Sequence, residues 1–136
     1  MNKTQSAKVA ISKFNRFTKV VTFETRLTNE NASDIIGSKE YDWDIVMDGS
    51  DNAGTRYLIN DACVIYGKPL VSGSALKWEG QITVLNYKNG PCYRCLYPNP
   101  PPAIAVTSCS DGGVVGMVPG LIGQMQAIEI VKIILE

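Results

Sequence analysis

A short apolar run that ends in a polar turn constrains the fold of this chain more than any other segment. The run spans residues 44–47, which is too short for a helix, and turn-forming residues bound it, as is typical of a buried parallel strand. Asp48-Gly49-Ser50-Asp51-Asn52 follows, so two carboxylates are expected at the carboxyl end of the strand. Ligands of open α/β sheets bind at such ends. The segment therefore predicts an α/β fold with a ligand site beside these aspartates.

Helical and strand-like patterns alternate on both sides of this run. The expected elements are a helix over residues 7–14, a strand over 21–27, a short helix capped by Asn29 and running to about Ile36, a helix from Gly54 to Gly67 with Gly67 as a left-handed cap, a strand at 70–71, and a strand at 82–85 closed by the turn at 88–91. With 136 residues, the chain is long enough for one domain with a core. We therefore expect one domain, with αβ units and their aspartates over residues 1–90.

The remaining third of the chain lacks this alternation. No regular pattern extends from Pro91 to about Met117, and four prolines between residues 98 and 102 disfavour strand pairing there. A loop this long usually serves a site. The chain then closes with a helix that opens at Pro119 and is apolar around most of its circumference, so a sheet or a partner must cover it. The predicted division is a cysteine-containing loop over 91–118 and a terminal helix over 119–136.

The composition narrows the classes of function. Lysine plus arginine and aspartate plus glutamate both number 13, so no global field draws the chain to nucleic acid or to an anionic membrane. No basic segment followed by an apolar stretch opens the chain, and no apolar run is expected to span a bilayer, which favours a cytoplasmic protein. The chain contains no histidine. Ser-His-Asp and Cys-His catalysis are therefore excluded.

The two aspartates after the predicted strand allow two interpretations. Asp48 and Asp51 could hold Mg²⁺ beside nucleotide phosphates, because a hard cation prefers oxygen ligands. They could equally shape the turn and cap the next helix, and the pattern alone does not separate these readings. Lys3 could reach a phosphate, although a lone exposed lysine is more often only solvated.

The cysteines differ in their surroundings. Cys92 and Cys95 have the spacing of half a tetrahedral zinc site, while a redox pair or two unligated surface thiols are the alternatives. Cys63 lies on the apolar face of its helix and is expected to pack in the core. Cys109 lies in a loop bordered by glycines, where backbone amides could stabilise an anion, which favours a nucleophile. Asp111 would oppose formation of that thiolate.

The ordered set of motifs closely resembles the ThiF/MoeB family over essentially the whole chain, and within it the eukaryotic molybdopterin-synthase sulfurylases. The motifs that carry the resemblance are Asp48-Gly49-Ser50-Asp51-Asn52, Thr55-Arg56, Asn60-Asp61-Ala62-Cys63, residues 79–84, Pro91-Cys92-Tyr93-Arg94-Cys95, Cys109 and Gly112-Gly113-Val114. Each motif is weak alone, but their order and spacing are specific.

The resemblance implies both a fold and an activity. Members of the family use ATP and Mg²⁺ to adenylate the C-terminal glycine of a ubiquitin-like sulfur carrier that ends in Gly-Gly, and sulfur then attacks the acyl-adenylate. By resemblance, the chain is the C-terminal part of a Rossmann-like adenylation domain with a long crossover loop. Asp51 would hold Mg-ATP, Lys3 would contact a phosphate, Cys109 would be the catalytic thiol of the crossover loop, and Cys92 with Cys95 would bind Zn²⁺. The product would serve tRNA thiolation or molybdenum cofactor synthesis.

The chain also departs from the family pattern. Upstream, members carry a glycine-rich nucleotide loop, and downstream they carry a second Cys-x-x-Cys; this sequence has neither. We therefore expect a fragment that is not active by itself, with an uncovered terminal helix that favours association, including a homodimer. The rival hypothesis is a non-catalytic homologue that binds a ubiquitin-like protein or dimerises with an intact activating enzyme. A small zinc or redox protein is a third reading.

Overall fold

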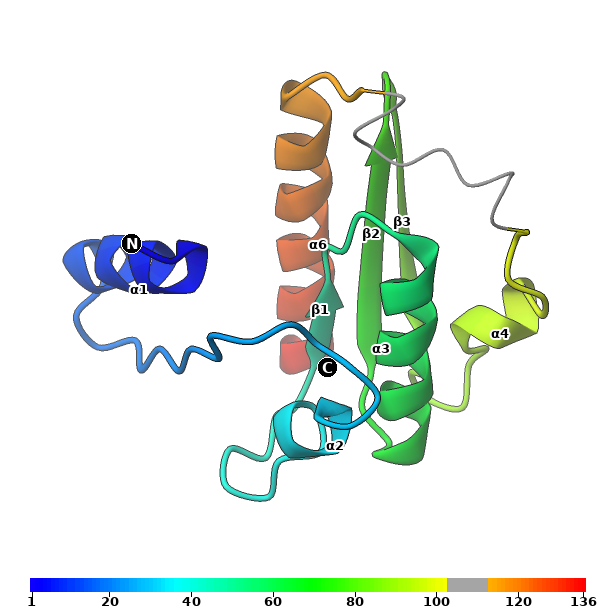
Figure 1. Ribbon diagram of the computed structural model, residues 1–136, viewed down its shortest axis with the longest axis horizontal. Helices are drawn as coiled ribbons and strands as arrows, with labels where there is room; N and C mark the ends of the chain where they lie inside the picture. Colours follow the sequence, from blue (N-terminus) through cyan, green and yellow to red (C-terminus); the bar gives the residue numbers. More distant parts are fainter. Residues whose placement is uncertain (103–112) are drawn as a thin grey trace.

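The structure is a computed structural model that describes residues 1–102 and 113–136 (Figure 1). Its elements, in chain order, are α1 (Lys3–Phe14), α2 (Ala32–Ile35), β1 (Val46–Asp48), α3 (Ala53–Ile65), β2 (Leu70–Leu76), β3 (Glu79–Leu85), α4 (Tyr93–Leu96) and α6 (Met117–Leu135). Strand and helix alternate only over β1, α3 and β2, and the protein has an α/β fold with a small sheet.

The three strands form one sheet in the order β1-β2-β3. β1 pairs in parallel with β2, which confirms the parallel strand predicted from the run that ends at Asp48. β2 and β3 pair antiparallel along their full length, from Leu70 opposite Leu85 to Leu76 opposite Glu79. The expectation that β1 is wholly buried is wrong, because Met47 is half exposed. α6 packs chiefly against β2 and β3 rather than against β1.

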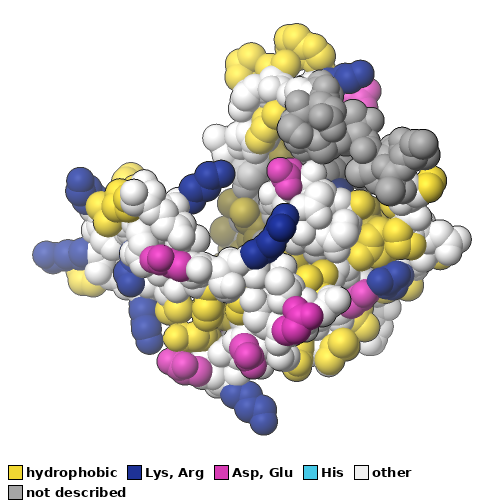
Figure 2. Space-filling view, in the orientation of Figure 1, with side chains coloured by type: hydrophobic (Ala, Val, Ile, Leu, Met, Phe, Trp, Pro, Cys, Tyr) yellow, Lys and Arg dark blue, Asp and Glu magenta, His cyan; other side chains and the backbone are white. Residues whose placement is uncertain are grey.

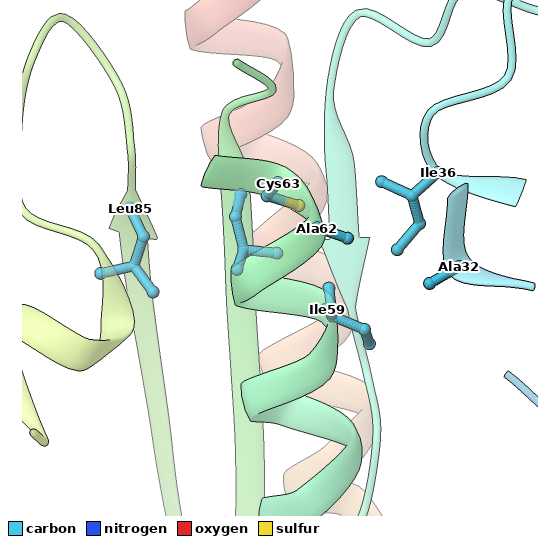
Figure 3. Packing of buried hydrophobic residues seen from close by; sticks show 7 residues of the cluster. Ala32, Ile36, Ile59, Ala62, Cys63 and Leu85 are labelled. Carbon is cyan, nitrogen blue, oxygen red and sulfur yellow. The ribbon is translucent and has the colours of Figure 1, made fainter. Parts of the chain in front are cut away.

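The hydrophobic core lies between the sheet and helices α2 and α3 (Figure 3). Its buried members are Ala32, Ile36, Ile59, Ala62, Cys63, Leu70 and Leu85. Cys63 is fully buried, so the prediction that it packs as a core residue is confirmed. α3 ends before Gly67, whose φ of 64° is the left-handed cap expected from the sequence.

Helix α6 covers the opposite face of the sheet and approaches the strands closely. A Cβ atom at Gly73 would lie 2.5 Å from the side-chain amide of Gln126, and one at Gly80 would lie 2.4 Å from Cδ1 of Ile122. The two strands therefore need glycine where the helix crosses them. α6 begins at Met117 rather than Pro119, which is compatible with proline because the first turn of a helix has no intrahelical N–H bonds.

The outer face of α6 is apolar and uncovered in this chain, as expected. Its exposed large hydrophobic side chains are Met117, Leu121, Met125, Ile128, Val131, Ile134 and Leu135. Among the described residues, α6 is a helix long and apolar enough to cross a membrane by length and composition, a test that core helices of soluble proteins also pass. The expectation that no apolar run reaches this length is therefore wrong.

Two further expectations for the first half of the chain are wrong. The alternating residues 21–27 do not form a strand, because they pair with none of β1, β2 and β3, and a strand requires a neighbour for its backbone groups. The short helix is capped at Asn31 rather than Asn29 and begins at Ala32. The Asn31 side chain turns back and accepts a hydrogen bond from the Thr28 backbone, so it closes the preceding turn instead.

Candidate functional site

A cleft of about 650 Å³ opens at the carboxyl ends of β1 and β2. Its walls are the loop at residues 49–53 with Arg56, the ends of β2 and β3 at residues 73–76 and 79–81, and Val114, Pro119, Ile122 and Gln126. Ligands bind at this edge of α/β sheets. The sequence therefore predicted the position of the cleft, but not that α6 would form one of its walls.

Asp48 is buried beneath the cleft and is held by three hydrogen bonds. Its Oδ1 atom accepts from the Ser50 backbone N–H at 2.8 Å, and its Oδ2 atom accepts from Ser72 Oγ at 3.1 Å and from Arg56 Nε at 3.3 Å. Arg56 Nη2 also donates to the Ser50 carbonyl at 3.0 Å. This network favours the turn-shaping interpretation for Asp48, because the donors around its carboxylate belong to the protein itself.

Asp51 lies on the cleft wall with its carboxylate exposed. The helix cap belongs to its neighbour: the Asn52 side chain accepts from the Thr55 backbone N–H at 2.8 Å, while its Nδ2 atom donates to Asp51 Oδ1 at 3.3 Å. Neither aspartate caps α3. The position of Asp51 at the rim is compatible with a ligand role, and that role remains a prediction.

The Ser50 hydroxyl is the unusual polar group at this wall. Its Oγ atom is buried and has no hydrogen-bond partner among the described residues. A buried hydroxyl without a partner costs free energy, so it often indicates a group that the protein binds. Sequence reasoning did not single out Ser50, and only its place between the two aspartates could have drawn attention to it.

Lys3 is not brought to the cleft in this structure. It is the first residue of α1, a helix without buried residues that lies apart from the sheet in Figure 1. On the face shown in Figure 2, basic side chains gather around this helix at the left. The proposed contact of Lys3 with a phosphate remains a prediction.

Cys92 and Cys95 lie together at the start of α4, with their Sγ atoms 3.5 Å apart. Two thiolates at about 2.3 Å from one tetrahedral zinc ion lie roughly 3.8 Å apart, so the pair fits one edge of such a site. No group of three or more potential ligands occurs within residues 1–102 and 113–136. The two sulfur atoms are thus close enough to share one ion, and their role as zinc ligands remains a prediction. Cys109 falls outside the described residues.

Polar side chains on α3 hold the Cys92 and Cys95 turn in place. The Asn60 Oδ1 atom accepts from the Tyr93 backbone N–H at 2.7 Å, and Arg94 donates to both carboxylate oxygens of Asp61 at 2.6 and 2.7 Å. The bonds from Arg94, and to a smaller extent one from the Asn60 Nδ2 atom, lower the pKa of Asp61. The sequence alone assigned no role to Asn60. The feature that could have indicated one is its place on the same helical face as Tyr57 and Asp61.

The turn also changes the acidity of one thiol. Burial of Cys92 works against its ionisation, but hydrogen bonds from Cys95, from the Arg94 backbone and from Asn60 outweigh burial and lower the pKa of Cys92. The buried Cys63 behaves in the opposite way, since burial and then the charge of Asp48 raise its pKa to about 12. Metal binding requires a thiolate, so the lowered pKa favours Cys92 as a ligand over the buried Cys63.

The fold and the cleft together define an α/β protein with a candidate ligand site at the carboxyl ends of parallel strands. The sequence pattern of the ThiF family matches residues 1–136, and the chain belongs to this family. It is 60% identical over 134 residues to the adenylyltransferase and sulfurtransferase MOCS3 of Dictyostelium discoideum, which covers 98% of this chain and 31% of that protein.

Vertebrate proteins with the same name give similar values. Identity is 53% over 133 residues with that of Xenopus laevis, covering 98% of this chain and 29% of the relative. Identity with the protein of Danio rerio is 56% over 131 residues, which covers 96% of this chain and 28% of that relative. The chain therefore spans about three tenths of the length of the curated relatives that it matches.

Proposed function

We propose that this chain supplies the magnesium-binding side of a nucleotide cleft, in a protein that adenylates the C-terminal glycine of a ubiquitin-like sulfur carrier and then transfers sulfur to it. The observation that carries the proposal is the cleft at the carboxyl ends of β1 and β2, with Asp51 on its wall. The names of the relatives, adenylyltransferase and sulfurtransferase, support the reaction class. The carrier would end in Gly-Gly, and the purpose would be molybdenum cofactor synthesis or tRNA thiolation.

The charges of the cleft support a role for a metal ion. Among its described lining residues, Asp51 and Glu79 are acidic, and Arg56 is basic but already bonded to Asp48. This part of the protein therefore offers little positive charge to a polyphosphate. When bound, Mg²⁺ would neutralise the phosphate charge. Asp51 would hold that ion, and the unpartnered Ser50 hydroxyl beside it is a second hard oxygen at the same wall.

We assign the remaining residues by their place in the same scheme. The strands and helices would form the C-terminal part of a Rossmann-like domain, with residues 91–118 as the crossover loop and α6 as the terminal helix of the 119–136 segment. Cys109 would be the thiol that takes part in sulfur transfer, and Lys3 would contact a phosphate. Cys92 and Cys95 would provide two zinc ligands that fix the base of the loop. We propose a cytoplasmic location.

The proposal is tested by carrier-dependent exchange of pyrophosphate into ATP, with this chain in the full-length protein that its gene encodes. Asp51→Ala should lower exchange by roughly a hundredfold, because the carboxylate that would hold the metal ion at the reacting phosphates is lost. Asp44→Ala is the matched control, since Asp44 is exposed and precedes the opposite end of the same strand. Equal exchange in both variants would contradict the assignment of Asp51.

The uncovered face of α6 favours a second candidate function. Its exposed apolar side chains extend from Leu121 to Leu135, and such a surface is more typical of an interface than of solvent-exposed protein. In this reading, the chain binds a ubiquitin-like protein or dimerises with an intact homologue without turning over ATP. Sedimentation with and without a Gly-Gly carrier separates binding from catalysis. If Asp51→Ala still associates with the carrier or with a second copy, and if the chain does not affect pyrophosphate exchange, binding is favoured over catalysis.

A further inference from the structure

Gln126 connects the buried side of α6 to both parallel strands. It is 3% exposed, and its Nε2 atom donates to the Asp48 carbonyl at 2.8 Å and to the Val71 carbonyl at 3.0 Å. A side-chain amide nitrogen has two N–H groups, so both are used. The two acceptors lie on β1 and β2, at the level where the chain leaves β1 for the loop at residues 49–52. The side chain therefore bridges the two strands at the edge where the cleft opens.

The site is shaped for this side chain. Gly73 on β2 has no Cβ, and a Cβ there would lie 2.5 Å from the Gln126 side-chain amide. The amide thus occupies space that any other residue at position 73 would fill. Asp48 is consequently held from both faces of the sheet: Gln126 bonds its carbonyl from the α6 side, while Arg56 and Ser72 bond its carboxylate on the α3 side.

We propose that Gln126 is a positioning residue that fixes the carboxyl end of β1 and so sets the place of Ser50 and Asp51 on the cleft wall. The inference rests on the proposed function only where it concerns Mg-ATP; the fixing of the loop stands on the geometry alone. Its basis is the combination of a buried two-donor bridge and a glycine that makes room for it. If Gln126 only filled space, its amide would not need to lie within hydrogen-bond distance of the Asp48 and Val71 carbonyls.

Hydrogen–deuterium exchange on this chain tests the positioning role. Gln126→Met keeps the length of the side chain but removes both donors, and two buried carbonyls then lose a partner. Backbone amides of residues 48–52 should exchange roughly tenfold faster or more, and that increase should exceed the one at the β2–β3 pairing. Gln124→Met is the matched control, because Gln124 lies on the same helix and is exposed. Unchanged exchange at 48–52 would overturn the proposal.

A second variant guards against a packing effect. In Gln126→Glu the introduced carboxyl faces two carbonyl oxygens and can donate only when protonated, so protection of residues 48–52 should recover as the pH falls. Asp48, Asp51, Arg56 and Glu79 are the charged groups of the same region. These charged groups are equally present in Gln126→Met. If protection of residues 48–52 recovers at low pH only in Gln126→Glu, the hydrogen bonds of residue 126 are the cause. The same pH response in both variants would overturn the positioning role of Gln126.

Binding of Mg-ATP, used as the probe with the full-length protein, separates this inference from the proposed function. If the loop at 48–52 is the metal side of the cleft, Gln126→Met should weaken Mg-ATP binding several-fold, and Gln124→Met should not. Unchanged Mg-ATP binding in Asp51→Ala would refute the proposed function. It would not affect the hydrogen–deuterium exchange result for Gln126→Met. Faster exchange at 48–52 with normal Mg-ATP binding in Gln126→Met would refute the link between the loop and the nucleotide.

Discussion

Removing the guanidinium of Arg56 should destabilise the fold far more than removing that of Arg94, although both pair with a carboxylate. Arg56→Met takes away the bonds to Asp48 and to the Ser50 carbonyl and leaves a carboxylate whose side chain is 0% exposed. Removal of one partner from a buried pair costs about 3–5 kcal/mol. Asp48 keeps two neutral donors, from Ser50 and Ser72, so we expect a cost just below that range, about 2–3 kcal/mol.

Urea unfolding followed by circular dichroism measures this difference. With a denaturant dependence of about 2 kcal/mol per molar urea, the midpoint of Arg56→Met should fall by about 1–1.5 M. Arg94→Met is the matched control, because Arg94 and Asp61 are 44% and 38% exposed and water replaces the lost contact. Its midpoint should fall much less. A loss in Arg56→Met no larger than in Arg94→Met would refute the argument from burial.

A double variant isolates the unpaired charge as the cause. Asp48→Asn combined with Arg56→Met removes the buried charge together with its partner, so the pair should be more stable than Arg56→Met alone by about 1 kcal/mol. If the double variant instead lost the sum of the two single effects, the bulk of the Arg56 side chain rather than its charge would be responsible.

Three further predictions concern packing, acid stability and thiol reactivity. Gly73→Ala should lower the melting temperature because its Cβ would meet the Gln126 amide, a cost of about 1–3 kcal/mol, whereas Gly120→Ala, with open space around its Cβ, should not lower it. The pKa of Asp61 is below its ordinary 3.8, so the contribution of Asp61 to stability is present above that pH and is lost as the pH falls further. Arg94→Met should therefore make the melting temperature depend less on pH between 5 and 3. An unchanged slope of melting temperature against pH would contradict this prediction. Mass spectrometry after alkylation at pH 8 should find Cys63 modified only in the unfolded chain, because burial raises its pKa to about 12; labelling of Cys63 in the folded protein would contradict it.

The sequence predicted much of the α/β layout because the signals are local. The run ending at Asp48 is a strand, α3 ends before Gly67, and Cys63 is buried, all from periodicity, turn chemistry and apolar patterning. The same kind of signal failed over residues 21–27, where alternation is present but the segment pairs with none of β1, β2 and β3. Alternation records which side of a segment is apolar, whereas a strand also needs a backbone partner that local patterning does not specify.

The candidate site divides in the same way. The sequence alone determined which groups could do chemistry: Asp51 after a strand, Cys92 and Cys95 at metal spacing, and no histidine. Only the tertiary structure decided that the Asp48 carboxylate pairs with Arg56. It alone also decided that Gln126, which is 78 residues after Asp48, donates to the Asp48 carbonyl at the base of the cleft. The physical reason is that a side chain's intrinsic chemistry is local, but its available partners are fixed by long-range packing, here of α6 onto glycines of β2 and β3.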